Sequence, residues 1–150
     1  MTAKSGKPSA KALNIISALL MVVLLACQFM PYWRFGEGET LSIQGYVWFP
    51  TKHPALTEEL LPLVEKFPCN QAVMACIPVM ILCLLGVWFC LSKSGKPLIG
   101  LLPVLTGAVG LLMYLTSPVM RAGMLCWLHV AVLALLLVTG ILTLAGKKQN

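Results

Sequence analysis

Hydrophobic residues in this chain gather in four long stretches that contain no Asp, Glu, Lys or Arg. Each stretch is longer than about 18 residues, a length typical of a membrane span rather than of a core helix. A helix rises about 1.5 Å per residue, so each run can cross a hydrocarbon core of roughly 30 Å. None of the runs alternates with a period of two, so the pattern predicts helices. The uncharged stretches are Ala12–Trp33, Phe67–Ser92, Pro97–Ser117 and Ala122–Gly146.

This pattern predicts an all-α membrane protein in which residues 1–150 form a single domain, a four-transmembrane-helix bundle. Composition agrees with that class, since 59% of the residues are hydrophobic, 11% are charged and the mean hydropathy is +0.88. We expect a multi-pass integral protein of the cell membrane, which is the cytoplasmic membrane if the source is a bacterium. The predicted spans cover residues 12–30, 70–91, 97–116 and 122–145, and residues 31–69 form the one large loop.

Charged residues are divided between the two predicted sides of the membrane. Seven of the eleven Lys and Arg residues precede the first span, separate the second from the third, or follow the fourth. All five acidic residues lie in the loop between the first two spans. Because Lys and Arg are enriched on the cytoplasmic side, both termini are predicted to be cytoplasmic and the large loop extracytoplasmic. The net charge of +6 therefore reflects membrane topology, and we expect no nucleic-acid partner.

Two segments of the large loop have a clear periodicity. Thr40–Phe49 alternates apolar and polar residues, with Leu41 and Ile43 on the same face, and this predicts a half-buried strand. Pro54–Lys66 has leucines at helical spacing, but Pro62 would interrupt a long helix, so we expect a short surface helix of one or two turns. The loop is therefore expected to be structured.

Aromatic and basic residues in and beside this loop are the candidates for contact with a partner. Exposed aromatic and Arg side chains are enriched at protein interfaces, and an outer loop places them away from the bundle core. Besides the lipid bilayer, we expect either another membrane protein or a second copy of this chain as the partner. The interface candidates are Trp33, Arg34, Tyr46, Trp48 and Phe49.

Cysteines recur every seven residues along the second predicted span, which places them on one helical stripe. Small polarizable side chains on such a stripe suit close packing between helices. Two alternatives remain open: a disulfide joining Cys69 to Cys126 or Cys27, and the chemistry of a membrane thiol–disulfide oxidoreductase, although the chain has no C-x-x-C pair. The stripe extends over roughly 30 Å, which is too far for one metal site, so we expect no metal or other cofactor. Its members are Cys69, Cys76, Cys83 and Cys90.

Polar residues inside the predicted spans are few. His129 is the one ionisable residue well inside a span, and an intramembrane ionisable group raises the hypothesis of a transport pathway. No intramembrane Asp, Glu, Lys or Arg accompanies it, so a histidine hydrogen-bonded within the bundle is the competing interpretation. Gln28, near the outer surface, is expected to hydrogen-bond between elements of the bundle.

Small residues predict how the helices pack. In the third span Gly100, Gly107, Ala108 and Gly110 predict close approach of a neighbouring helix.

Aromatic residues near the span ends predict interfacial belts. Trp33, Tyr114 and Trp127 belong to the outer belt, and Trp88 with Phe89 to the inner one.

The layout of the loop resembles the claudin-like tetraspan proteins. In claudins the first span ends in a tryptophan-bearing stretch, here Met30-Pro31-Tyr32-Trp33-Arg34, and a strand follows that ends in Gly-Leu-Trp, here Gly45-Tyr46-Val47-Trp48. The resemblance covers residues 29–75 by pattern and the rest by topology. The cysteine pair that follows Gly-Leu-Trp in claudins has no counterpart here.

This resemblance implies a small extracellular sheet packed on a left-handed four-helix bundle. It also implies work by adhesion, by paracellular sealing, or as an auxiliary subunit of a channel. These remain expectations for the present chain.

No constellation of catalytic residues is visible in the sequence. It has no HExxH motif, no carboxylate pair within a span, no glycine-rich phosphate loop and no Ser/His/Asp set. We therefore expect no catalytic site and a non-catalytic integral membrane protein, an accessory or scaffold subunit that binds another membrane protein through its outer loop and helix faces. The alternatives are a small oligomeric transporter or channel, and a membrane thiol–disulfide oxidoreductase.

Overall fold

The computed structural model describes residues 9–35, 38–48, 76–92 and 98–147, and these are mostly helical with one small two-stranded sheet. The predicted surface helix at 54–66, Phe49, Cys69 and the start of the second span at 70–75 lie outside the described residues. The long helices are α1 (Ala10–Cys27), α5 (Cys76–Leu91), α6 (Leu98–Thr116) and α8 (Cys126–Lys147). The short elements are β1 (Pro31–Phe35), β2 (Glu39–Ser42), α2 (Ile43–Trp48) and α7 (Pro118–Arg121).

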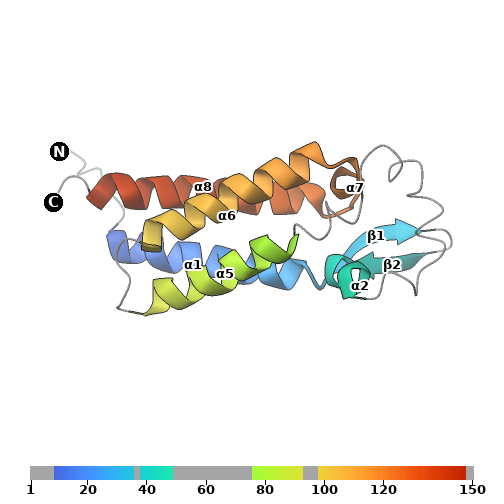
Figure 1. Cartoon of the computed structure of the whole chain (residues 1–150), viewed down its shortest axis with the longest axis horizontal. Coiled ribbons are helices and arrows are strands. Elements are labelled where there is room, and N and C mark those ends of the chain that lie inside the picture. Colours follow the sequence, from blue (N-terminus) through green and yellow to red (C-terminus); the bar gives the residue numbers. More distant parts are fainter. Residues whose placement is uncertain (1–8, 36–37, 49–75, 93–97, 148–150) are drawn as a thin grey trace, which may run out of the picture.

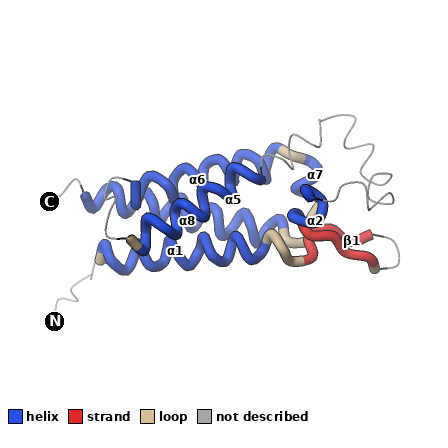
Figure 2. The backbone as a smooth tube through the Cα atoms, turned by 60° about the horizontal axis from the view of Figure 1, so that its bottom comes forward, coloured by secondary structure: helices blue, strands red, loops and turns tan. Residues whose placement is uncertain are grey.

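The four long helices form a bundle in which α1 packs on α5 and α8, and α6 packs on the same two helices (Figures 1 and 2). One end of the bundle carries β1, β2, α2 and α7, and it is called the strand end below (Figure 1). At the other end, the terminal end, α1 begins and α8 finishes (Figure 1). All the short elements therefore lie at the strand end.

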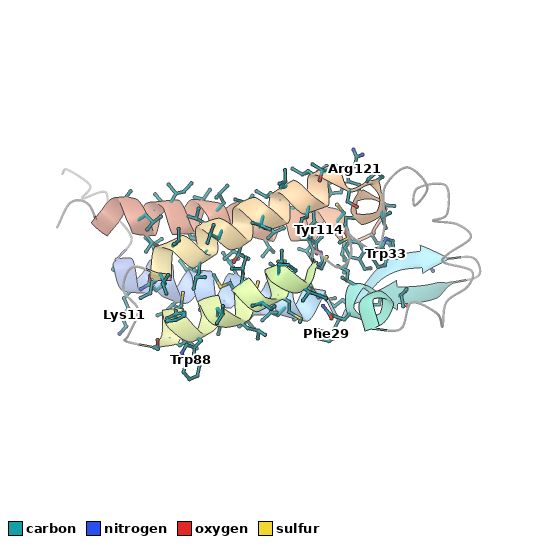
Figure 3. All side chains as sticks on the ribbon, in the orientation of Figure 1. Lys11, Phe29, Trp33, Trp88, Tyr114 and Arg121 are labelled. Carbon is teal, nitrogen blue, oxygen red and sulfur yellow. The ribbon has the colours of Figure 1, made fainter. Side chains whose placement is uncertain are left out.

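Two of the helices, α6 and α8, are long and apolar enough to cross a membrane, as judged by length and composition. Over their described lengths, α1 and α5 are apolar but shorter. Apolar side chains cover the outside of the bundle as well as its centre (Figure 3). Leu112 and Leu135, for example, are 66% and 53% exposed, whereas Leu133 and Leu136 are fully buried. Helices that are hydrophobic all round are typical of a membrane environment or of a large protein core.

Glycines allow α6 and α8 to approach each other closely. A Cβ added at Gly107 would lie 2.8 Å from the Leu133 carbonyl oxygen, closer than real Cβ atoms approach a neighbour. Gly140 of α8 faces the Val104 backbone nitrogen at the same distance, so the contact is made from both helices. The predicted close packing of the third span is confirmed for its three glycines, but Ala108 is exposed and takes no part.

Hydroxyl groups add a polar contact inside the bundle. The Ser17 hydroxyl of α1 donates to the Thr139 hydroxyl of α8 at 3.0 Å, and both residues are buried. The Thr139 hydroxyl in turn donates to the Leu136 carbonyl at 3.1 Å. Such bonds satisfy hydroxyl groups that an apolar environment would otherwise leave unpaired.

The predicted strand Thr40–Phe49 is wrong beyond its first residues. β2 ends at Ser42, and α2 follows at once. The Ser42 hydroxyl accepts the Gly45 amide hydrogen at 3.0 Å, the bond of a helix N-cap, so a capped turn of helix replaces the alternating strand. The partner of β2 is β1, which the sequence pattern did not predict; the two pair antiparallel, with Arg34 opposite Thr40.

The predicted boundaries of two spans also change. α1 ends at Cys27 and not at residue 30, because the chain turns through Gln28–Met30 before β1 begins. α8 begins at Cys126 and not at residue 122, because Gly123 belongs to a turn in which its amide donates to the Met120 carbonyl at 3.2 Å. Residues 28–30 and 122–125 therefore form turns at the strand end and not turns of helix.

Candidate functional site

Two adjacent aromatic residues of β1 are both buried. Tyr32 is 0% exposed and Trp33 is 2% exposed. Neighbouring residues of a regular strand point to opposite faces, so two consecutive buried side chains require a departure from that geometry. The register supplies it: Pro31 pairs with Ser42 and Trp33 with Leu41, which leaves Tyr32 as an extra residue, a β-bulge. The bulge therefore directs both aromatic rings into the strand end of the bundle.

Three hydrogen bonds join β1 to the segment between α6 and α8. The Tyr32 hydroxyl donates to the Met120 carbonyl at 2.5 Å, and the Trp33 indole nitrogen donates to the Val119 carbonyl at 3.0 Å. The backbone amide of Met124 donates to the Tyr32 carbonyl at 2.7 Å. Since the aromatic hydroxyl and indole groups are buried, these bonds both satisfy them and fix the position of the strand.

Gly123 provides the space for the Tyr32 ring. A Cβ added at Gly123 would overlap three carbon atoms of that ring. The backbone φ of Gly123 is not in the left-handed region, so the glycine is required here for space and not for its conformation.

An aromatic cluster, defined as Tyr32, Trp33, Tyr114 and His129, fills the strand end. The His129 and Tyr114 rings are stacked, with centroids 5.0 Å apart and an interplanar angle of 18°. The Tyr32 ring meets His129 edge to face at 5.2 Å, and it meets Trp33 in the same way at 4.7 Å. Figure 3 shows Trp33 on the strand side and Tyr114 on the helix side of this cluster. The cluster therefore combines side chains from β1, α6 and α8.

His129 is completely buried, and one of its ring nitrogens has a hydrogen-bond partner. Its Nδ1 lies 2.9 Å from the Leu125 carbonyl oxygen, one turn earlier in the chain. Because a carbonyl can only accept, Nδ1 carries a proton and donates. Nε2 has no hydrogen-bond partner among the residues that the structure describes. His129 is therefore fixed by a hydrogen bond to the preceding turn and by ring contacts with Tyr32 and Tyr114.

The Tyr114 hydroxyl is the other polar group of the cluster without a regular hydrogen bond within the described part of the chain. It lies beside the Cys76 thiol of α5, which is a weak donor and a weak acceptor. The α5 helix thus also contacts the cluster.

Gln28 and Gln44 form a second polar contact at this end. The Gln44 side-chain amide donates to the Gln28 side-chain carbonyl at 2.6 Å, and the Gln44 backbone amide donates to the Gln28 backbone carbonyl at 3.2 Å. Both glutamines are buried. The pair attaches α2 to the end of α1, so Gln28 makes the kind of inter-element hydrogen bond that its position predicts.

The predicted partner-contact residues do not form one surface. Arg34 is exposed. Trp33 is buried, so its side chain cannot touch a partner, and its predicted place in the outer aromatic belt is wrong. The predicted place of Tyr114 in that belt is wrong as well, because Tyr114 is 0% exposed. Tyr46 and Trp48 belong to α2 and not to a strand, and their side chains lie outside the described part of the structure.

The cysteines of the described segments are free thiols. Cys27 and Cys126 are both buried and neither is in a disulfide. Cys76 and Cys83 are buried and Cys90 is half-buried, so the described members of the cysteine stripe face the bundle interior. Within residues 9–35, 38–48, 76–92 and 98–147, no three His, Cys, Asp or Glu side chains are close enough to bind a metal ion.

Tyr32, Tyr114, Gln44 and Gly123 carry much of this site, and sequence reasoning missed their roles. An aromatic residue next to a proline at the end of a span fits an interfacial belt equally well. A bulge and a contact between residues 32 and 123 leave no periodic signal in one sequence. Comparison of the chain with protein-family models, curated proteins and solved structures finds no match.

Proposed function

We propose that this chain is a four-span integral membrane protein with both termini in the cytoplasm, and that it acts as a non-catalytic accessory or scaffold subunit for another membrane protein. The observation that carries the proposal is the attachment of β1 to the bundle through the buried Tyr32 and Trp33 side chains. This attachment gives the strand end a fixed shape. A fixed surface binds a partner with less loss of conformational entropy than a flexible loop does.

Four crossings are supported by the surface of all four long helices. α1 and α5 expose apolar residues in the same way as α6 and α8, with Leu19 at 60% and Leu84 at 54%. Such residues are stable against lipid chains and unfavourable against water. The positive residues that flank the terminal end in the sequence support a cytoplasmic location for that end.

The interior supports a structural role rather than a transport pathway. Among the described residues no Asp, Glu, Lys or Arg is buried, and the buried polar groups are hydroxyl, amide and imidazole. Fully buried Leu24, Leu133 and Leu136 occupy the centre of the bundle, where a pathway would need polar lining. A pathway through one copy of the bundle therefore has little support. A transporter or channel formed by several copies, and a thiol–disulfide oxidoreductase, remain the alternative proposals.

The exposed part of the strand end supports a partner with an acidic surface. Arg34 of β1 and Arg121 of α7 are both exposed, and Arg121 projects away from the bundle (Figure 3). Exposed arginines on a fixed surface bind carboxylates through two hydrogen bonds each. We therefore expect the partner to present Asp or Glu residues on the outer side of the membrane.

Site-specific photo-cross-linking in native membranes tests the proposed role. A photoreactive residue at Thr40, which is exposed opposite Arg34, is expected to give a discrete adduct with a second membrane protein. The same residue at Leu142, which is 46% exposed on α8, serves as the control and is expected to give no such adduct. Loss of the Thr40 adduct on Arg34→Glu substitution would support the acidic partner. Absence of any Thr40 adduct in a protein that is present and folded contradicts the scaffold role.

Cysteine labelling tests the proposed topology separately. A membrane-impermeant maleimide is expected to label Thr40→Cys in intact cells and to label Ser9→Cys only after permeabilisation. The described native cysteines are buried or half-buried, which keeps their background low. Labelling of Ser9→Cys from outside would reverse the proposed orientation without affecting the bundle itself.

A further inference from the structure

An apolar groove of about 580 Å³ runs between α1 and α5. This volume lies within the range of roughly 300–1,000 Å³ in which proteins hold small-molecule ligands. Val22 and Leu25 contribute the α1 side. The α5 side and its end are formed by Leu84, Val87, Trp88, Leu91 and Ser92. Apart from Ser92 and the indole nitrogen of Trp88, the lining side chains are purely hydrocarbon.

The groove is apolar along most of its length and polar at one end. Its apolar part is formed by the second half of each helix, and Ser92 lies just beyond the last residue of α5. Trp88 is 70% exposed, and it lies at the same end of the bundle as Lys11 (Figure 3). A tryptophan and a lysine at one end of an apolar surface are typical of the boundary between the hydrocarbon and the headgroups of a membrane.

No Asp or Glu of the described residues lies at this end to balance its basic side chains. Lys11 is exposed in the first turn of α1, and that turn contains no acidic residue. A helix N-terminus already has a partial positive charge, so a lysine there is unfavourable unless an anion is near. In the sequence the nearest charged neighbours are also basic, Lys7 before α1 and Lys93 directly after Ser92. An anionic ligand would relieve this repulsion.

We propose that the groove binds one acyl chain of an anionic phospholipid and that the headgroup lies beside Lys11 and Ser92. Basic sites between helices on the cytoplasmic side of membrane proteins favour anionic lipids, and the apolar lining accommodates the chain. This inference rests on the membrane placement proposed above. It adds a specific lipid ligand at the end of the bundle opposite to the partner surface.

Native mass spectrometry of the detergent-solubilised full chain tests the inference with two lipids of identical acyl chains, phosphatidylglycerol and phosphatidylcholine. We expect one tightly bound phosphatidylglycerol, preferred about fivefold or more over phosphatidylcholine. Leu84→Trp, which places a larger side chain in the groove, is expected to remove the preferred site. Leu135→Trp is the matched control, because Leu135 is 53% exposed against 54% for Leu84 and lies on α8, away from the groove. Lys11→Gln is expected to reduce the preference between the headgroups without removing the chain.

Leu91→Trp provides a second groove variant, since Leu91 is 71% exposed and its substitution makes little demand on the bundle core. Equal lipid binding by the wild type and both groove variants would overturn the inference, and so would equal affinity for the two lipids. A wild-type dimer that both groove variants dissociate would overturn it as well, because a second copy would then cover the groove. A protein that stays in solution without detergent would instead refute the membrane placement, which separates the two failures.

Discussion

The ring of Tyr32 packs directly against the backbone of Gly123, although the two residues are far apart in the sequence. The contact leaves no room for even a methyl group at position 123. It brings β1 against the turn between α7 and α8, where the Met124 amide bonds to the Tyr32 carbonyl at 2.7 Å. The strand platform, β1, β2 and α2, thus depends on a glycine in another part of the chain.

Gly123→Ala is therefore expected to destabilise the protein. The added carbon would displace the Tyr32 ring, and overpacking of this kind typically costs about 1–3 kcal/mol in the free energy of unfolding. Gly146→Ala is the control, because a Cβ there meets nothing within 4 Å. Thermal unfolding in detergent should show a lower midpoint for the first variant and no decrease for the second. An unchanged midpoint for Gly123→Ala would mean that the ring contact is not tight in solution.

A pH dependence follows from the buried tyrosine. Burial, and next the neighbouring Cys126, raise the pKa of Tyr32 above its usual value near 10. Above about pH 10 the unfolded chain loses this proton more readily than the folded protein does, so the contribution of Tyr32 to stability is complete below that pH and is lost as the pH rises. Tyr32→Phe removes this titration together with the bond to Met120, at a cost of about 1 kcal/mol near neutral pH.

The stability difference between wild type and Tyr32→Phe is therefore expected to narrow as the pH rises from about 9 to about 11. Both proteins contain the same lysines and the same other tyrosines, so the difference between their stability curves isolates the titration of Tyr32. If the two curves remain parallel, Tyr32 does not titrate with a raised pKa.

The contact between α6 and α8 can be tested at two adjacent positions. Gly107→Leu would place a side chain against the α8 backbone, which lies only 2.8 Å from the point that a Cβ at residue 107 would occupy, so the helices would have to separate. We expect a loss of about 1–3 kcal/mol or failure to fold. Ala108→Leu adds the same side chain on the exposed face of the same helix turn and is expected to change stability by less than about 0.5 kcal/mol. Similar losses at both positions would exclude the glycine contact as the cause.

His129 separates the structural interpretation from transport. His129→Phe keeps a ring that can stack on Tyr114, and it removes Nε2, which has no hydrogen-bond partner in the described part of the chain. The Leu125 carbonyl still accepts the backbone amide of residue 129 at 3.0 Å. We expect a stability change within about 1 kcal/mol. His129→Ala leaves a cavity and is expected to cost about 2–5 kcal/mol. Loss of cellular function in a stable His129→Phe variant would favour a role for the imidazole itself.

Sequence patterns predicted helices better than the contacts between them. Residues inside each long helix are apolar over more than four turns, and this pattern is visible without any knowledge of neighbours. The cysteine stripe and the α6 glycines were predictable for the same reason, because helical spacing alone puts them on one face. The membrane placement itself depends on surroundings that a single folded chain does not include.

The strand end could not be predicted in the same way. Alternation in Thr40–Phe49 resembles a strand, but one hydroxyl, that of Ser42, caps the amide of Gly45 and starts a helix instead. Tryptophan is a residue type enriched at interfaces, and it is the bulge at Tyr32 that directs the Trp33 side chain inward. A single cap or bulge therefore changes the local structure within two or three residues, whatever the alternation of apolar and polar residues predicts.

The bulge has a consequence for how this chain can change length. One added residue in β1 is what allows Tyr32 and Trp33 to be buried together while Arg34 stays in solvent. Deleting a single residue between Cys27 and Trp33 would draw the strand back by one position and direct the Arg34 guanidinium toward the space now filled by indole. An unpaired buried charge is far more costly than a lost aromatic contact. A single-residue deletion between α1 and β1 is therefore expected to be strongly destabilising.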